Sequence, residues 1–120
     1  MSKILVVEDD PMSLFMMEEM LSELGVDFIS AKDGAEAVSC MYEHGSDLSV
    51  VLMDIHMPKV SGDEAVRLIR AADKNPPRDL QILAMTADNQ WHNSAKLYAA
   101  GFSGALPKPI NLDQLRRAIA

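Results

Sequence analysis

The stretch SVVLMDIHMP, residues 49–58, places a single carboxylate, Asp54, directly after a run of apolar residues. The run 50–53 is typical of a strand that is buried on both faces of a sheet. Because such a strand is shielded from water, the presence of an ionisable residue at its end requires an explanation. Asp54 either forms a turn or a helix cap, or it lies at a site where a carboxylate has chemistry to do.

The segments on both sides of this strand alternate between short apolar runs and amphipathic stretches. The predicted strands are 3–8, 26–31, 48–53, 80–86 and 103–106. The predicted helices are 11–24, 32–44, 62–73, 89–100 and 111–120. This alternation predicts an α/β fold with a parallel sheet covered on both faces. Right-handed crossovers then favour a flavodoxin-like, doubly wound five-stranded sheet of order 2-1-3-4-5 with five helices.

Helix ends and helix faces can also be predicted from residue types. Asp10 is the expected N-cap of the first helix, Pro11 its first residue and Gly25 its stop. Apolar spacing predicts inward side chains in the second, third and last helices: Ala35, Val38, Met41 and Tyr42, then Ala65, Leu68, Ile69 and Ala72, then Leu112, Leu115 and Ile119.

Length and composition indicate one soluble globular domain that spans residues 1–120. Apolar residues make up 48% and charged residues 24% of the 120-residue chain, values typical of a folded domain. No apolar run approaches the roughly 18 residues that span a bilayer, and we expect no secretory signal. Cys40 has no partner for an internal disulfide, which fits a reducing compartment. We therefore expect a cytoplasmic domain without membrane contact.

The charge of the chain disfavours direct binding to nucleic acid. The formal net charge is −7, and the 11 lysines and arginines are scattered except for Arg116 and Arg117. A nucleic-acid surface needs a basic stripe. The arginine doublet is interpreted instead as a solvated helix terminus, where cations favour the negative end of the helix dipole.

Chemically active side chains follow four of the five predicted strands. The first strand ends at Glu8 and Asp9, Asp54 follows the third, Thr86 ends the fourth, and the fifth runs into Lys108. Ligands bind outside the carboxyl ends of the strands in such a sheet, so these groups are expected to converge. Each has an ordinary interpretation as a turn or cap residue. Together, however, several carboxylates repel unless a cation lies between them, and Mg²⁺ suits an open carboxylate site.

Four motifs in this order resemble the receiver domain of two-component response regulators. They are ILVVEDDP at 4–11, VVLMDIHMP with SG at 50–58 and 61–62, LAMTA at 83–87, and PKP at 107–109. The resemblance covers the whole chain. The stretches EDDPMSLFMMEEMLSELG at 8–25 and ILAMTAD at 82–88 look most like receivers attached to hybrid sensor histidine kinases, so the chain is either a single-domain regulator or a receiver from a longer protein.

The resemblance implies a signalling role rather than an enzyme. Asp54 is expected to accept a phosphoryl group from a histidine kinase or a histidine phosphotransfer protein, and Thr86 and Lys108 to bind the phosphoryl oxygens. A receiver of this kind catalyses only its own phosphorylation and slow dephosphorylation. It is expected to be a monomer or a weak dimer.

The resemblance also implies a magnesium site made by Glu8, Asp9, Asp54 and His56. Asp9 and Asp54 would bind Mg²⁺ by their side chains, Glu8 would hold metal-bound water, and His56 would contribute its backbone carbonyl. Phosphoryl transfer needs mainly positioning and charge neutralisation, so this set of groups suffices.

Two other functional classes remain as alternatives. One is a phosphatase or phosphotransferase that forms an aspartyl phosphate, although such enzymes usually carry a second Asp two residues after the nucleophile, where this chain has His56. The other is a nucleotide-binding domain, but neither glycine-rich phosphate-binding motif follows the first strand.

Several residues near the site carry separate predictions. His56 and Asp88 are expected to alter the dephosphorylation rate without being needed for phosphorylation. Receivers usually have Tyr or Phe three residues before the lysine, where this chain has Ala105, so a different output is expected. Phe102 is predicted to be core, and Trp91 is either exposed as a partner contact or folded over its neighbours.

Two further expectations come from the resemblance. The Lys108–Pro109 peptide bond is expected to be cis. The first helix is expected to offer an adaptable, methionine-rich surface to a phosphodonor protein, because it carries more methionines than one buried face needs.

Overall fold

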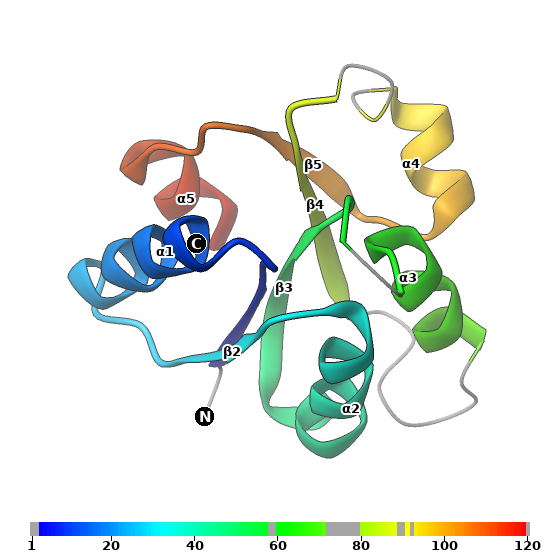
Figure 1. Ribbon diagram of the computed structural model, residues 1–120, viewed down its shortest axis with the longest axis horizontal. Coiled ribbons are helices and arrows are strands. Elements are labelled where there is room, and N and C mark those ends of the chain that lie inside the picture. The colour runs from blue at the N-terminus through cyan, green and yellow to red at the C-terminus, as the bar shows by residue number, and fades with distance from the viewer. Residues whose placement is uncertain (1–2, 58–59, 72–79, 89–90, 92, 120) are drawn as a thin grey trace.

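A computed structural model describes residues 3–57, 60–71, 80–88, 91 and 93–119 of the chain. Its centre is a five-stranded parallel sheet of order β2-β1-β3-β4-β5 (Figure 1). The strands are β1 Lys3–Val7, β2 Phe28–Ala31, β3 Leu48–Asp54, β4 Gln81–Thr86 and β5 Gly104–Pro107. The predicted fold class and strand order are therefore confirmed, and β2 is two residues shorter at its start than predicted.

Two helices cover one face of the sheet (Figure 1). They are α1 Pro11–Glu23 and α5 Leu112–Ile119. As predicted, Asp10 is the N-cap of α1, because its carboxylate accepts a hydrogen bond from the Ser13 backbone N–H at 3.2 Å. Leu14, Met17 and Leu21 of α1 pack with Leu115 of α5 on the apolar side chains of the strands.

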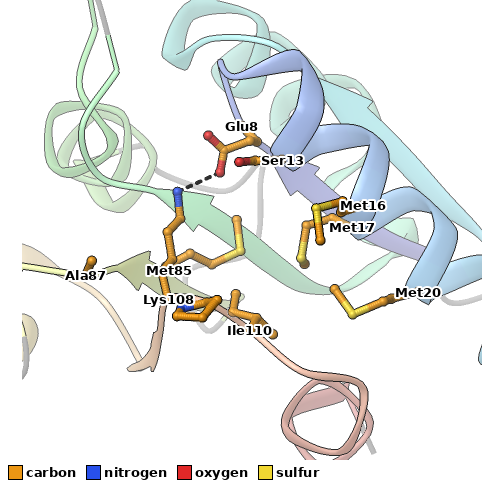
Figure 2. A pocket seen from close by; sticks show the side chains of 10 residues that line it. Glu8, Ser13, Met16, Met17, Met20, Met85, Ala87, Lys108 and Ile110 are labelled. Atoms are coloured by element: carbon orange, nitrogen blue, oxygen red, sulfur yellow. Dashed lines mark hydrogen bonds and ion pairs between the residues drawn. The ribbon is translucent and has the colours of Figure 1, made fainter.

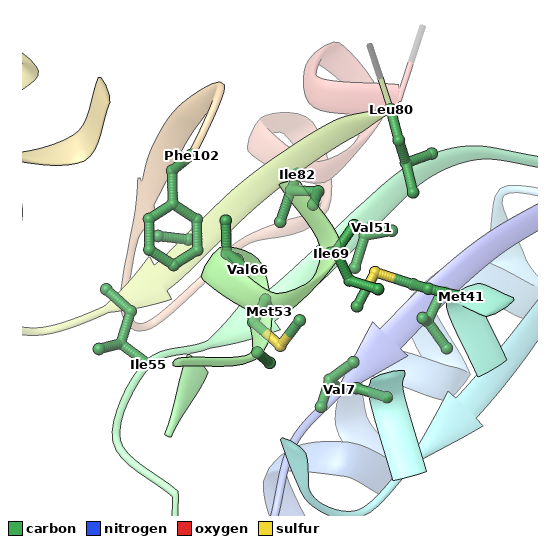
Figure 3. Close-up of a cluster of buried hydrophobic side chains, with 14 of the residues drawn as sticks. Val7, Met41, Val51, Met53, Ile55, Val66, Ile69, Leu80, Ile82 and Phe102 are labelled. Carbon is green, nitrogen blue, oxygen red and sulfur yellow. The ribbon is translucent and has the colours of Figure 1, made fainter. Parts of the chain in front are cut away.

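Three helices cover the opposite face: α2 Gly34–His44, α3 Gly62–Ala71 and α4 Ser94–Ala100. A short 3₁₀ helix, η1 Gly45–Asp47, joins α2 to β3. This face holds the larger hydrophobic core (Figure 3), in which Met41, Val66, Ile69 and Phe102 lie against Val51, Met53 and Ile82 of the sheet. The segment 72–79, including the predicted Ala72, lies outside the described residues.

The structure corrects the predicted inward faces of α2 and α3. Ala35 and Tyr42 are exposed, and Leu68 is 53% exposed, whereas Ala37, Val66 and Ile69 are buried. Met41, Ala65 and Ile69 are buried as predicted, and Val38 packs against the core while partly buried. The first glycine of each helix, which apolar spacing does not mark, is also buried because it lies against backbone.

Gly34 and Gly62 are the residues at which these contacts occur. A Cβ on Gly34 would lie 2.2 Å from the Val60 carbonyl oxygen, and a Cβ on Gly62 would lie 2.3 Å from the Asp54 carbonyl oxygen. Only glycine allows so close an approach. The start of α3 is thereby fixed directly against the end of β3.

In the part of the chain that the structure describes, no helix combines the length and apolar character needed to cross a membrane.

Candidate functional site

The carboxyl ends of β1, β3, β4 and β5 meet at one edge of the sheet (Figure 1). Val7 pairs with Met53, Asp54 with Met85, and Thr86 with Pro107. The residues that immediately follow these strands therefore lie side by side. Among them are Glu8 after β1 and Lys108 after β5.

Three carboxylates gather at this edge. Glu8, Asp9 and Asp54 each offer an oxygen atom, and these atoms all lie within 4.8 Å of one another. Glu8 is 2% and Asp54 5% exposed, whereas Asp9 is exposed. Carboxylate oxygens are hard ligands that suit Mg²⁺. The exposed position of Asp9 leaves room for the several water molecules that a bound Mg²⁺ usually keeps.

The Lys108 ammonium group lies beside two of these carboxylates. Its Nζ is 2.7 Å from Oε2 of Glu8 and 3.4 Å from Oδ1 of Asp54. Figure 2 shows the contact with Glu8. The Lys108–Pro109 peptide bond is cis, as the resemblance predicts. One cation is thus shared by two buried anions, which leaves the site with excess negative charge.

Burial and charge raise the pKa of Asp54. Loss of solvent around the carboxyl group is the largest cause, the hydrogen bond and charge of Glu8 add to it, and Lys108 opposes it, so that the pKa is about 7. For Lys108, burial lowers the pKa, but the hydrogen bond and charge of Glu8 and the charge of Asp54 outweigh it and the pKa is raised. The site therefore keeps its lysine charged and favours a further cation.

Thr86 lies at the end of β4 and is 1% exposed. Its hydroxyl oxygen accepts a hydrogen bond from the Asp88 backbone N–H at 2.9 Å. Its carbonyl oxygen accepts one from the Lys108 backbone N–H at 3.1 Å. Met85 pairs with Asp54, so Thr86 lies one residue beyond this pair. The hydrogen bond from the Lys108 N–H links Thr86 to the segment that carries the lysine.

The His56 side chain lies outside the cluster of carboxylates. Its imidazole is exposed, and Nε2 lies 3.3 Å from Oδ2 of Asp88. The contact joins the loop after β3 to the loop after β4. The suggested contribution of the His56 backbone carbonyl to a metal stays a prediction.

Sequence reasoning did not identify two features of the site. The first is the close approach of Gly62 to the Asp54 backbone, reinforced by the hydrogen bond from the Gly62 N–H to the Ile55 carbonyl at 2.8 Å. The second is the direct ion pair between Glu8 and Lys108, which no local pattern reveals because the residues are 100 positions apart.

A pocket of about 330 Å³ opens beside Lys108 (Figure 2). Its walls are mainly Met16, Met17 and Met20 of α1, with Met85 and Ile110 opposite. On the outer surface of α1 next to it, Met12 is 67% exposed and Phe15 and Met16 are each 56% exposed. The surface formed by Met12, Phe15 and Met16, here called the α1 apolar surface, is thus continuous with the pocket.

Of the two arrangements predicted for Trp91, exposed or folded over its neighbours, the structure has the second. Trp91 is buried and folded over its neighbours, with its ring centroid 5.9 Å from that of Phe102 at an interplanar angle of 79°. Phe102 is a core residue, as predicted. Ala105 lies half-buried on β5.

The sequence matches a known family over nearly its full length. The profile of the family described as "Response regulator receiver domain" matches residues 4–120. The virulence sensor protein BvgS of Bordetella pertussis is 38% identical over 98% of this chain, and the sensor protein GacS of Pseudomonas syringae pv. syringae is 32% identical over 98%. The chain spans only 10% and 13% of the length of these two relatives.

Solved structures give the same relationship. The receiver domain of sensor histidine kinase PA1611 from Pseudomonas aeruginosa PAO1, with a magnesium ion coordinated in its active-site cleft, has a TM-score of 0.85 and is 32% identical, over 98% of this chain and 93% of that one. The receiver domain of Ssk1 in complex with the phosphotransfer protein Ypd1, from Saccharomyces cerevisiae, has a TM-score of 0.81 and is 29% identical, over 98% and 85%.

Proposed function

Because this chain belongs to the response regulator receiver domain family, we propose that Asp54 is the residue at which it is phosphorylated. The observation that carries the proposal is the position of the Asp54 carboxylate. It is buried at the end of β3, among two other carboxylates and 3.4 Å from the Lys108 ammonium nitrogen. The proposed domain covers residues 1–120.

The reaction forms one bond and breaks another. An oxygen of the Asp54 carboxylate attacks phosphorus, and the bond from phosphorus to a histidine nitrogen of the donor breaks, so that the nitrogen keeps the electron pair. A carboxylate is a competent acceptor, and the acyl phosphate that results is labile enough for a reversible signal. Lys108 and the Thr86 hydroxyl stabilise the phosphoryl oxygens by charge and by hydrogen bonding.

The carboxylates fit a Mg²⁺ ion. Asp9 and Asp54 would bind it through their side chains, Glu8 through a water molecule, and His56 through its backbone carbonyl. The ion supplies charge neutralisation between the attacking carboxylate and the phosphoryl oxygens. Support comes from the 4.8 Å grouping of three carboxylates and from the magnesium ion in the PA1611 receiver.

A histidine kinase or a histidine phosphotransfer protein is the proposed phosphodonor. The α1 apolar surface borders the opening of the pocket that Lys108 lines. A helical donor that covers this surface would therefore bring a phosphohistidine close to Asp54. The adaptable side chains of methionine suit such a contact. The complex of the Ssk1 receiver with Ypd1 supports this class of partner.

The relatives suggest a larger protein around this domain. Because the chain spans only 13% of the length of GacS and 10% of the length of BvgS, we propose that it acts as the receiver of a hybrid sensor histidine kinase. In that setting it works in the cytoplasm, as a monomer or weak dimer, without direct contact to nucleic acid or lipid.

Incubation with Mg²⁺ and acetyl phosphate tests the proposal. Intact mass spectrometry should detect one phosphoryl group on the protein, and peptide mapping should place it on Asp54. Asp54→Asn should abolish the adduct, whereas Asp47→Asn, at an exposed position before β3, should retain it. Rapid multiple turnover of general phosphomonoesters would favour the phosphatase alternative instead.

A further inference from the structure

Trp91, the only tryptophan of the sequence, joins three parts of the molecule. Its ring packs edge-on against Phe102, which lies just before β5. The ammonium group of Lys96, in the first turn of α4, lies 4.4 Å from the centroid of the indole ring. Its backbone belongs to the loop that follows β4. A movement of that loop must therefore change the surroundings of the indole ring.

Two hydrogen bonds lead from the candidate phosphorylation site to Trp91. The Asp88 N–H donates to the Thr86 hydroxyl oxygen at 2.9 Å, and the Trp91 N–H donates to the Asp88 carbonyl oxygen at 3.0 Å. The Thr86 side chain therefore holds the turn that carries the tryptophan. It is also the hydroxyl proposed to bind a phosphoryl oxygen on Asp54.

The far side of the aromatic pair is held firmly. The Phe102 N–H donates to the Leu97 carbonyl at 3.0 Å and the Ser103 N–H to the Ile82 carbonyl at 2.7 Å. The Arg70 guanidinium donates to the Gly101 carbonyl at 2.9 Å. Phe102 is thus fixed to α4, β4 and α3, whereas the backbone of Trp91 is bonded to the turn that begins at Asp88.

Strand β5 offers no aromatic ring at the position next to the site. Ala105 pairs with Ala84 and carries only a methyl group, which has no alternative rotamer. A movement of Thr86 can therefore be transmitted to the Trp91 ring in the loop after β4. At position 105 of β5 there is no aromatic ring that could respond.

We propose that Trp91 is the aromatic group that responds to phosphorylation of Asp54, through the hydrogen bonds that connect Thr86, Asp88 and Trp91. The inference rests on the proposed function. When the Thr86 side chain moves so that its hydroxyl donates to a phosphoryl oxygen, the hydroxyl oxygen shifts away from the Asp88 N–H, this hydrogen bond lengthens and the turn relaxes. Trp91 then separates from Phe102 and Lys96, which alters the start of α4. Such coupling is reciprocal, so the packing of Trp91 also biases Thr86.

The first experiment follows the indole ring during phosphorylation. Tryptophan emission and its quenching by acrylamide report on Trp91 alone, because the sequence has no other tryptophan. With Mg²⁺ already present, addition of acetyl phosphate should roughly double the quenching constant, in step with the adduct measured by mass. Asp54→Asn should show no change under the same conditions.

Two failures of this experiment can be told apart. If the adduct forms and the Trp91 signal does not change, the inference is wrong and the proposed function stands. If no adduct forms on Asp54, the proposed function fails and the inference fails with it.

The second experiment needs no phosphoryl group. Thr86→Val removes the hydroxyl acceptor of the Asp88 N–H but keeps the shape of the side chain, so Trp91 should be more accessible to acrylamide before any phosphorylation. Thr86→Ser keeps the acceptor and should match the wild type. Circular dichroism checks that both variants are folded, and equal quenching in folded Thr86→Val and wild type would overturn the pathway.

Discussion

The ammonium nitrogen of Lys108 lies 2.7 Å from a carboxylate oxygen of Glu8, a residue 100 positions earlier in the chain. Glu8 is almost fully buried, and its pairing with Lys108 is closer than the pairing of Lys108 with Asp54 at 3.4 Å. Lys108 therefore stabilises a buried anion as well as facing Asp54, the proposed phosphoacceptor. Removing it affects both folding and chemistry.

Lys108→Met should destabilise the metal-free protein by about 2 kcal/mol near neutral pH, because Glu8 and Asp54 lose their shared cation in a buried site. Chemical denaturation measures this change. Lys32→Met, at an exposed lysine after β2, is the matched control and should cost much less. Mg²⁺ should restore part of the loss in Lys108→Met, since it supplies positive charge to the same carboxylates. Equal stability of the two variants would contradict the assigned role of Lys108.

Asp54→Asn should remove a pH dependence from the metal-free protein. The pKa of Asp54 is raised from 3.8 to about 7 in the folded state, so the folded state binds this proton more tightly than the unfolded state. The stability from this proton is fully present below pH 3.8 and is lost as the pH rises through about 7. The variant should therefore become more stable than the wild type as the pH rises, by about 2 to 4 kcal/mol at the alkaline end.

Urea denaturation of both proteins from acid to mildly alkaline pH, without divalent cations, measures this difference. Asp47→Asn, at an exposed aspartate, should follow the wild type at every pH. A constant difference between Asp54→Asn and wild type across this range would show that the Asp54 carboxyl group is not perturbed.

The adjacent residues Asp9 and Asp10 should differ in their effect on Mg²⁺ binding. Asp9 contributes an oxygen to the group of three carboxylates, whereas Asp10 caps α1. Asp9→Asn should weaken Mg²⁺ affinity about tenfold or more, measured by isothermal titration calorimetry. Asp10→Asn should leave affinity within about twofold, and it preserves the cap because asparagine is an equally good N-cap residue. A larger loss in Asp10→Asn than in Asp9→Asn would mean that the metal is bound elsewhere.

Gly62→Ala should disturb the position of Asp54. The added Cβ would lie 2.3 Å from the Asp54 carbonyl oxygen and 2.8 Å from the Ile55 Cα, and backbone atoms cannot move aside cheaply. We expect a loss of about 2 to 4 kcal/mol in unfolding free energy and a lower rate of phosphorylation by acetyl phosphate in the folded fraction. Gly104→Ala is the control, because its nearest neighbour is the flexible end of Leu83 at 3.3 Å. Similar losses in both variants would argue against a specific contact.

Residue types near the strands were sufficient to predict the sheet and its functional edge. Continuous apolar runs such as 50–53 are local signals, and parallel strands necessarily bring their carboxyl ends together. The inward faces of α2 and α3 were predicted only in part, because Met41, Ala65 and Ile69 are buried whereas Tyr42 and Leu68 are exposed. Gly34 and Gly62 bring the starts of these helices close to Val60 and Asp54, which lie in other segments of the chain and are not marked by local spacing.

Local sequence patterns also could not predict which side chains pair with one another at the carboxyl ends of the strands. The pairing of Glu8 with Lys108 depends on how far a lysine reaches across two neighbouring strands, and the contact between His56 and Asp88 depends on the conformation of two loops. The burial of the Trp91 ring could not be predicted either, because its place in the sequence was compatible with both an exposed and a buried ring. Tertiary packing on Phe102 decided between them.

The pair formed by His56 and Asp88 should control the lifetime of the phosphoryl group. The two side chains lie 3.3 Å apart and connect the loops that follow β3 and β4, next to Asp54 and Thr86. The His56 side chain is exposed and that of Asp88 partly exposed, so both are placed to act on a water molecule that approaches the proposed phosphoryl group on Asp54. We expect His56→Ala and Asp88→Ala each to change the rate of dephosphorylation several-fold while phosphorylation by acetyl phosphate persists. Because the residues are in contact, the double variant should deviate from the product of the single effects. Loss of the adduct by intact mass in either single variant, with the protein folded, would instead assign that residue to the phosphorylation step itself.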